Sequence, residues 1–324
     1  MITMNKRPLI ILTGPTAVGK TSLSVQLAKC INGEIISADS MQVYKGMDIG
    51  SAKIMSEEMC GVPHHLIDIL EPWEEFNVVV FQQKCKECME EIYKRGHIPV
   101  LAGGTGFYIQ AVLRDIDFTQ NEENTEYRSG LEQLVDQMGQ EEAAAYLHQK
   151  LQEVDPESAE AIHANNIKRT IRALEYYHFS GEKISAHNEK EAQKENAYNA
   201  CYFVLNDDRS LLYERIEQRV DEMVHNGLVE EVKTLVEKGC TRDMVAMQGL
   251  GYKEIVDYLE GRCTLEEAVY IIKRDTRHFA KRQLTWFKRE KDVIWVEKNK
   301  FAYDQEKILR FMMDVMKEHH ILPV

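Results

Sequence analysis

One segment near the N-terminus restricts the fold more than any other. An apolar run from Pro8 to Thr13 is followed by a glycine-containing loop and then by helical spacing from Lys20 to Cys30. The loop matches the pattern G-x-x-x-x-G-K-[ST] with Gly14, Pro15, Thr16, Ala17, Val18, Gly19, Lys20 and Thr21. This order of strand, loop and helix is the context that the pattern requires, so the segment predicts a diphosphate-binding loop.

The residue types of this phosphate loop suit an anion. Glycines let successive backbone N–H groups face inward, and the N-terminus of the following helix adds partial positive charge. Lys20 neutralises phosphate charge, and the Thr21 hydroxyl can reach a Mg²⁺ ion. The loop alone leaves the reaction open, because a kinase breaks a P–O–P link whereas a transferase holds diphosphate as a leaving group.

Strand and helix patterns alternate beyond the loop, which predicts an α/β fold with a parallel, P-loop NTPase-like sheet flanked by helices. The expected strands are 34–38, 98–102 and 201–205, with a weaker candidate at 65–70. The expected helices are 78–95, 211–235, 265–287 and 303–316. Strand patterns are absent between them from 118 to 200, so we expect a catalytic core of 1–117 and 201–324 and a helical insertion of 118–200.

Composition narrows the classes of protein further. No run of about eighteen apolar residues is present, and the N-terminus lacks a signal-peptide pattern, so we expect a cytoplasmic protein without a membrane partner. Seven irregularly spaced cysteines fit reduced thiols. Cys85 and Cys88 form a lone C-x-x-C without further ligands at zinc spacing, which favours a structural role.

Charge is unevenly distributed along the chain. The net charge of −13 argues against nucleic-acid binding by bulk charge. Between Tyr270 and Lys291, however, eight basic residues face two acidic ones, giving a local charge of +6. This stripe predicts one directed polyanion site, and the alternative is a solvated helix face that balances an acidic neighbour.

A second block closely follows the expected strand 34–38 and runs from Ser37 to Lys53 as SADSMQVYKGMDIGSAK. Together with the phosphate loop it closely resembles the tRNA dimethylallyltransferases, also called tRNA isopentenyltransferases. The resemblance continues over nearly the whole chain through the blocks Pro63-His64-His65-Leu66, Gly103-Gly104-Thr105, Arg215-Ile216-Glu217-Gln218-Arg219, Gly249-Leu250-Gly251-Tyr252-Lys253-Glu254 and Ala280-Lys281-Arg282-Gln283-Leu284-Thr285-Trp286-Phe287. It implies the shorter, bacterial form, which lacks a C-terminal zinc finger.

The resemblance implies transfer of a dimethylallyl group from dimethylallyl diphosphate to N6 of adenine 37 in tRNA, with release of diphosphate. The adenine amine must lose a proton as it attacks, so a carboxylate is the natural base. Asp39, at the end of a strand near the phosphate loop, is placed for that role; a helix cap or a Mg²⁺ ligand is its alternative. Diphosphate leaves with negative charge that Lys20, the loop amides and Mg²⁺ would stabilise.

Further residues are assigned by the resemblance. Arg215 and Arg219 lie four residues apart on one expected helix, which the resemblance places near the diphosphate. We favour Arg219 as the residue that contacts it. The alternative is a solvated basic pair bonded to Glu217 or Glu222. Thr105 is expected to hydrogen-bond substrate near Asp39, or to cap the helix that follows. The expected tRNA contacts are Asp39, Ser40, Met41, Gln42, Thr105, Arg128, Lys168, Arg169, Arg172, Gln248, Gly251, Tyr252, Lys253, Lys281 and Arg282.

Adenine 37 would have to leave its stack to react, and phosphate contacts would offset that cost. The partners expected are therefore the tRNA anticodon stem-loop and dimethylallyl diphosphate, with Mg²⁺, and we expect a monomer. The pair His64 and His65 favours packing and hydrogen bonding, because adjacent side chains of an extended segment point apart.

Three other functions remain as alternatives. An adenylate isopentenyltransferase would prenylate free AMP, ADP or ATP, but the basic residues of the insertion and the stripe favour a larger acceptor. A small-molecule P-loop kinase would need a strand ending in a Walker-B-type aspartate, and 98–102 ends in Gly-Gly-Thr. A non-catalytic tRNA-binding module would leave the phosphate loop and Asp39 unexplained.

Overall fold

The computed structural model describes residues 6–118 and 125–322. It divides into a core unit, Met1–Leu113 with Asn196–Val324, and an insertion unit, Arg114–Glu195. The expected insertion was 118–200; strand β5 starts at Asn199 instead of Cys201, so the chain returns to the core earlier. The N-terminal residues 1–5 and the part of the expected insertion at 119–124 lie outside the described residues.

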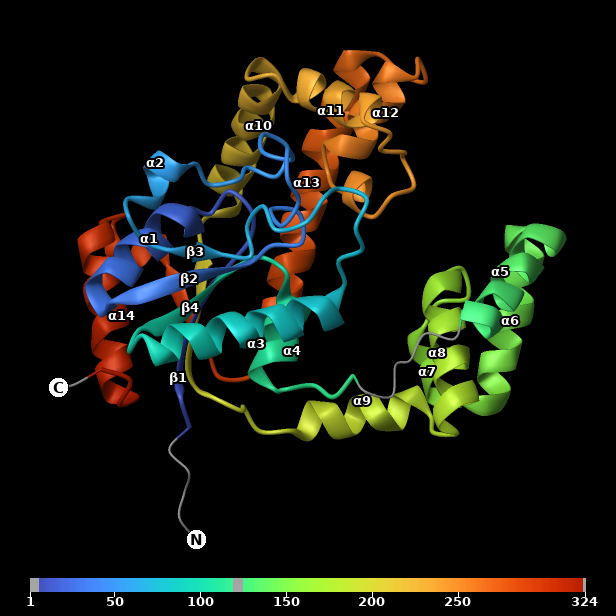
Figure 1. Cartoon of the computed structure of the whole chain (residues 1–324), viewed down its shortest axis with the longest axis horizontal. Helices are drawn as coiled ribbons and strands as arrows, with labels where there is room; N and C mark the ends of the chain where they lie inside the picture. The colour runs from blue at the N-terminus through green and yellow to red at the C-terminus, as the bar shows by residue number, and fades with distance from the viewer. Residues whose placement is uncertain (1–5, 119–124, 323–324) are drawn as a thin grey trace, which may run out of the picture. The chain divides into compact units, whose positions relative to one another are not determined.

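The core unit contains one parallel sheet in the order β3-β2-β4-β1-β5-β6 (Figure 1), which confirms the predicted α/β class. The strands are β1 Pro8–Thr13, β2 Gly33–Ala38, β3 His64–His65, β4 Ile98–Gly103, β5 Asn199–Asn206 and β6 Val293–Glu297. Side chains of β1 alternate between the faces: Leu9 and Ile11 enter one hydrophobic core, Ile10 and Leu12 the other. Both faces are covered, as a parallel sheet requires.

Helices cover the two faces of the sheet. On one face lie α1 Lys20–Ile31 and α14 Gln305–Glu318, and on the other α3 Val78–Lys94 and α4 Gly106–Leu113 (Figure 1). The remaining helices of the core unit are α2 Ser56–Met59, α10 Arg209–His225, α11 Leu228–Glu237, η1 Ala246–Gln248, α12 Tyr252–Leu259, α13 Leu265–Phe287 and η2 Lys298–Phe301. The long helix α13 starts at a capping box formed by Thr264 and Glu267.

Two expectations about these elements are corrected, and two elements were missed. The weak strand 65–70 shrinks to β3, because Leu66 and Asp68 adopt positive φ angles of 62° and 53° that end the extended conformation. The helix expected over 211–235 is two helices, α10 and α11, separated by Gly227 with φ 103°. Strand β6 and helix α12 were not predicted.

Helices are the regular secondary structure of the insertion unit among its described residues, as expected. It contains α5 Thr125–Met138, α6 Gln140–Val154, α7 Pro156–Ala161, α8 Ile167–Ser180 and α9 Ile184–Gln193. Its own core is built from Leu131, Leu147, Leu151, Ile171 and Leu174. Buried Asp155 caps α7 through Ser158 and also accepts bonds from Ser185, which joins α9 to the same small core.

Within the described part of the chain, no helix combines the length and apolar character needed to cross a bilayer.

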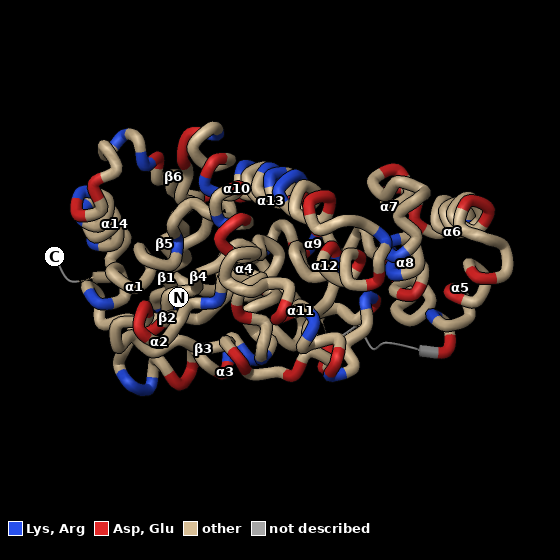
Figure 2. Tube along the Cα trace, turned by 90° about the horizontal axis from the view of Figure 1, so that it is seen from above, with Lys and Arg blue, Asp and Glu red and all other residues tan. Residues whose placement is uncertain are grey.

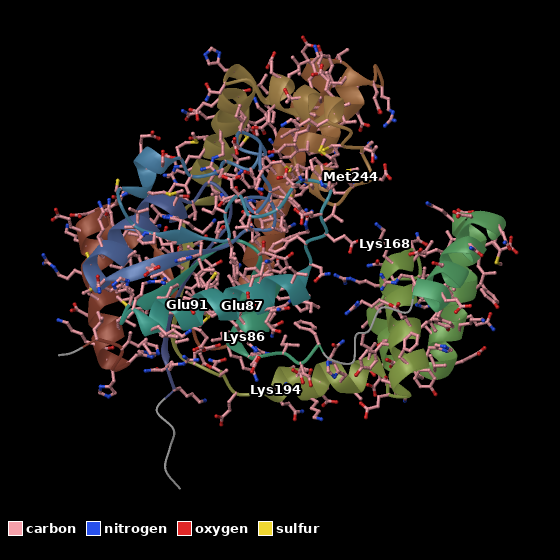
Figure 3. All side chains as sticks on the ribbon, viewed as in Figure 1. Lys86, Glu87, Glu91, Lys168, Lys194 and Met244 are labelled. Carbon is pink, nitrogen blue, oxygen red and sulfur yellow. The ribbon has the colours of Figure 1, made fainter. Side chains whose placement is uncertain are left out.

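Cys85 is buried on α3, and Cys88 lies on the same helix, half-buried. Their neighbours Glu87 and Glu91 are labelled along α3 in Figure 3.

A cluster of charges holds the amino ends of the strands together. The buried carboxylate of Glu34 on β2 accepts two bonds from Arg95 at 2.8 Å, one from His65 at 2.7 Å and one from His97 at 2.6 Å. The Arg95 guanidinium, aided by both histidines, lowers the pKa of Glu34 from 4.5 to about 2. His64 instead bonds the carbonyl of Val62. One carboxylate therefore joins β2 to β3, α3 and the start of β4.

This cluster predicts a defined acid sensitivity. A folded-state pKa below the unfolded value means that Glu34 stabilises the fold above about pH 4.5 and loses this contribution as the pH falls toward about 2. We expect Glu34→Gln to be less stable than wild type at neutral pH and to show a shallower loss of unfolding free energy between these pH values. Urea unfolding at a series of pH values measures this. Glu57→Gln, at an exposed glutamate of α2, is the control, and parallel curves for Glu34→Gln and wild type would disprove the assignment.

Candidate active site

The phosphate loop connects the carboxyl end of β1 to α1. Gly14 has φ 146°, and a Cβ atom there would lie 2.4 Å from the carbonyl oxygen of Leu205, so no other residue fits. Gly19 has φ 96° and is the residue before the helix. Lys20 donates to the carbonyl oxygens of Gly14 and Pro15 at 3.0 and 2.8 Å. The ammonium group therefore lies over its own loop.

The electrostatics of this loop favour an anion. Burial, together with the positive charge of Arg219, lowers the pKa of Lys20 from 10.5 to about 8, whereas the charge of Asp39 acts in the opposite direction. Burial also lowers the pKa of Arg219. Two desolvated cations that repel each other are stabilised when a polyanion enters between them.

Asp39 follows β2, and Thr105 follows the neighbouring strand β4. The Thr105 N–H donates to Ala38 O at 3.2 Å, which fixes the two turns against each other. Asp39 Oδ1 accepts from the Met41 N–H at 2.8 Å, which is a turn contact; the next helix, α2, begins only at Ser56, so the alternative role as a helix cap is wrong. Burial raises the pKa of Asp39, while the bond from Met41 and the charge of Lys20 lower it.

Asp39, Lys20 and Thr21 line one cavity of about 60 Å³. Its other walls come from α1, β2, β4 and the segment after β2: Ser24, Ile35, Ser37, Gln42, Ile54, His64, Ile67, Ala102 and Gly103. The structure thus brings the expected base, the loop lysine and the expected metal-binding threonine together. No group of three or more His, Cys, Asp or Glu side chains suited to a metal occurs within residues 6–118 and 125–322.

The two arginines of α10 have different surroundings. Arg215 forms a 2.5 Å ion pair with buried Asp207, the residue after β5, and not with Glu217 or Glu222 as its alternative role supposed. Arg219 is the arginine whose charge acts on Lys20. This difference favours Arg219 as the arginine that faces the diphosphate.

Two residues near the phosphate loop were missed by the sequence analysis. Gln283 of α13 accepts from the Thr16 N–H and donates to Gly104 O, each at 2.9 Å. Lys298 of η2 donates to Val18 O at 3.2 Å and lies 3.8 Å from Asp207. Gln283 belongs to one of the blocks that carry the resemblance, but nothing local distinguishes Lys298.

The segment after β2 lies beside the start of α12. A Cβ atom on Gly249 would come 2.6 Å from Cε of Met41, so the Met41 side chain packs directly against the backbone of Gly249. Gln42 uses its side chain internally, accepting from Ser37 and donating to the carbonyl of Ala52. The expected RNA contacts Ser40, Gln248 and Lys253 are at least partly exposed, whereas Gly251 is buried.

The structure argues against the expected contact between the Tyr252 side chain and tRNA. Its side chain is fully buried and its hydroxyl donates to Glu231 at 2.8 Å. Glu231 also accepts from the backbone N–H groups of Asp48, Ile49 and Gly50. Tyr252 therefore packs α12 against the loop 48–50, and its ring is not accessible to RNA.

The basic stripe is also partly corrected. Figure 2 shows Lys and Arg gathered along α13, but Lys273 pairs with Asp221 and Arg277 with Glu217, both on α10, and Arg274 pairs with Asp275. These three follow the alternative of a face that balances acidic neighbours. Lys281 and Arg282 are exposed and form no ion pair with any residue that the structure describes.

In the insertion unit, Lys168 and Arg169 are exposed near the start of α8, with half-exposed Arg172 one turn on. Figure 3 labels Lys168. Lys168 and Arg172 line a cavity of about 830 Å³ together with Arg128 of α5. Arg128 forms a 2.5 Å ion pair with buried Glu175. Part of its guanidinium is thus used within the unit.

Comparison with known proteins gives a consistent result. Residues 42–290 match the family model described as IPP transferase, and residues 8–68 match a model described as isopentenyl transferase. A tRNA dimethylallyltransferase of Lachnoclostridium phytofermentans is 61% identical over 316 residues, covering 98% of this chain and 99% of that protein.

Two solved structures are also similar. The full-length tRNA isopentenylpyrophosphate transferase of Bacillus halodurans has a TM-score of 0.72 and 45% identity, with 97% of this chain and 98% of that chain covered. A eukaryotic dimethylallyltransferase acting on tRNA has a TM-score of 0.76 and 29% identity, with 90% of this chain and 74% of that chain covered. The family model spans most of the chain, and the relatives align over nearly all of it, so this chain belongs to the IPP transferase family.

Proposed function

We propose that this chain transfers a dimethylallyl group from dimethylallyl diphosphate to N6 of adenine 37 in tRNA and releases diphosphate. The observation that carries the proposal is the shared cavity lined by Lys20, the lysine of the phosphate loop, and by the partly buried carboxylate of Asp39. Family membership supports the same reaction.

Asp39 accepts the proton from the adenine amine as the C–N bond forms. Its burial raises the carboxylate's pKa, which makes it a stronger base than an exposed aspartate. The bond from Met41 N–H to Oδ1 orients the group. Thr105, fixed next to it through Ala38, is placed to hydrogen-bond the substrate.

The C–O bond of the donor breaks as the diphosphate leaves. Loop N–H groups, Lys20 and Arg219 stabilise the charge that develops on it, and because they are already desolvated they need little reorganisation. The residues present fit a Mg²⁺ ion, since magnesium bound through substrate phosphates needs only one or two protein oxygens and Thr21 offers a hydroxyl at the cavity. Magnesium, when bound, supplies further positive charge to the leaving diphosphate.

The proposed acceptor is the anticodon stem-loop. Lys281 and Arg282 on α13 and Lys168, Arg169 and Arg172 on α8 are cations suited to phosphate contacts. A cytoplasmic, monomeric enzyme stays our prediction.

The acceptor distinguishes the proposal from its rivals. We expect purified protein with labelled dimethylallyl diphosphate and Mg²⁺ to label tRNA and not AMP, because the exposed cations suit a polyanion. ATP should not be consumed, because the loop holds the donor's diphosphate. Chromatography of the products measures both. Labelled AMP would favour an adenylate isopentenyltransferase, and stoichiometric ADP formation would favour a kinase.

Asp39→Asn separates proton acceptance from positioning. Asparagine keeps the shape and the acceptor for Met41 N–H but removes the basic charge. We expect kcat to fall by ~10²- to 10⁴-fold, the range for loss of a general base, with little change in tRNA affinity. Single-turnover rates over a range of Mg²⁺ concentrations measure this. Recovery of the rate at high Mg²⁺ would make Asp39 a metal ligand instead, and a rate within a few-fold of wild type would leave Asp39 with only its turn contact to the Met41 N–H.

The α8 cations are tested together. Replacing Lys168, Arg169 and Arg172 with alanine should raise the KM for tRNA and reduce its salt dependence by about one unit of slope for each cation that binds a phosphate in the wild type. Affinity for dimethylallyl diphosphate should not change. Lys183→Ala/Lys190→Ala, at exposed lysines of the same unit, is the matched control. Equal tRNA affinity of the triple variant and wild type at two salt concentrations would make this patch a solvated face.

A further inference from the structure

The side chain of Gln283 lies between the phosphate loop and the turn after β4. It is 6% exposed, and both ends of its amide are occupied. Oε1 accepts from the Thr16 N–H, and Nε2 donates to Gly104 O, each at 2.9 Å. A single buried amide therefore connects two loops that are far apart in sequence.

Gly104 leaves the space that this amide occupies. A Cβ atom on Gly104 would lie 2.2 Å from Gln283 Nε2, with the other neighbours at 3.5 Å or more. Gly104 does not have a positive φ, so its backbone accepts other residues. A side chain at this position would therefore have to displace the Gln283 amide.

The connection continues to the proposed base. Gly104 precedes Thr105, whose N–H donates to Ala38 O, and Ala38 precedes Asp39. On the other side, the Thr16 N–H is directed at Gln283, so it is not among the loop N–H groups free to bind phosphate. Gln283 thus fixes the direction of the phosphate loop and its position relative to the turns that carry Thr105 and Asp39.

We propose that Gln283 is a positioning residue that holds the phosphate loop in register with the Thr105 and Asp39 turns. This inference rests on the proposed function. A displacement of about 1 Å between donor and base can cost ~10²-fold in rate, so a buried amide at this point affects both donor binding and catalysis.

The first test uses inorganic pyrophosphate, which binds without prenyl transfer. At pH 7.5, we expect Gln283→Leu to weaken pyrophosphate binding by about 10-fold, since the Thr16 N–H loses its buried partner. Gln283→Glu should bind more weakly still because its carboxylate repels the anion. Calorimetry gives each Kd, and Gln305→Leu and Gln305→Glu, at an exposed glutamine of α14, are the matched controls.

Lowering the pH separates positioning from simple loss of packing. A protonated glutamate has one O–H donor and one carbonyl acceptor, so it can replace both bonds of the glutamine. The ratio of the Gln283→Glu Kd to the wild-type Kd should therefore fall toward one as the pH is lowered to about 5, whereas the ratio for Gln283→Leu stays constant. Equal pH dependence of the two ratios would overturn the proposal.

The second test displaces the Gln283 amide by changing Gly104, the residue whose carbonyl oxygen it binds. Gly104→Ala should displace the Gln283 side chain without altering α13, and reproduce the weaker pyrophosphate binding. If both changes act through one connection, the double variant Gly104→Ala/Gln283→Leu should be no worse than either single variant. With tRNA and saturating donor, the kcat of Gln283→Leu and of Gly104→Ala should each be ~10- to 100-fold below that of wild type. Their affinity for tRNA should be unchanged.

The outcomes separate the two proposals. Wild-type protein that does not bind pyrophosphate would overturn the proposed function and this inference with it. Wild-type binding with equal Kd values for folded Gln283→Leu, or fully additive losses in the double variant, would overturn the role of Gln283 alone. Thermal unfolding of every variant shows that the comparison is made on folded protein.

Discussion

Repulsion between two desolvated cations at the carboxyl edge of the sheet is the constraint on which the site depends. Lys20 and Arg219 are both partly buried, and the charge of Arg219 makes the charged form of Lys20 less stable. Lys20 bonds the carbonyl oxygens of its own loop, which only partly offsets this cost. Asp39 is the compensating charge that acts on Lys20, and a single carboxylate leaves an excess of positive charge. Several negative charges on one small ligand would remove that excess.

The sheet explains why these groups meet although they are distant in sequence. In a parallel sheet the carboxyl ends of all strands lie at one edge, and β2, β4 and β1 are neighbours in the order of strands. Their following residues are Asp39, the Gly104–Thr105 turn and the phosphate loop. The opposite edge is stabilised separately by the Glu34 cluster with Arg95, His65 and His97. The charge cluster that stabilises the sheet therefore lies at the amino ends of the strands, and the candidate active site lies at their carboxyl ends.

Local patterns predicted much of this fold, and contacts between distant residues account for the rest. The phosphate loop, β1, β2, β4, β5 and α13 were predicted because each has a clear period or motif. Helix α10 was joined to α11 in the prediction because both continue the same apolar spacing, and only the positive φ of Gly227 interrupts it. Asp39 and Lys20 could be paired from the motif and from strand order. Lys298 and the buried position of Tyr252 could not, since each depends on how a distant segment packs.

Helix α13 shows why charge counted along a sequence overstates what a surface offers to a polyanion. Its first half carries Lys273, Arg274 and Arg277, and all three are paired with carboxylates of α10 or of α13 itself. The pairs of Lys273 and Arg277 hold α10, and with it Arg219, against α13. The second half exposes Lys281 and Arg282 on one side and directs Gln283 toward the phosphate loop on the other. The same run of basic residues therefore has two roles. The members paired with α10 hold that helix, which carries Arg219, in position beside α13. The exposed Lys281 and Arg282 are available to an RNA backbone.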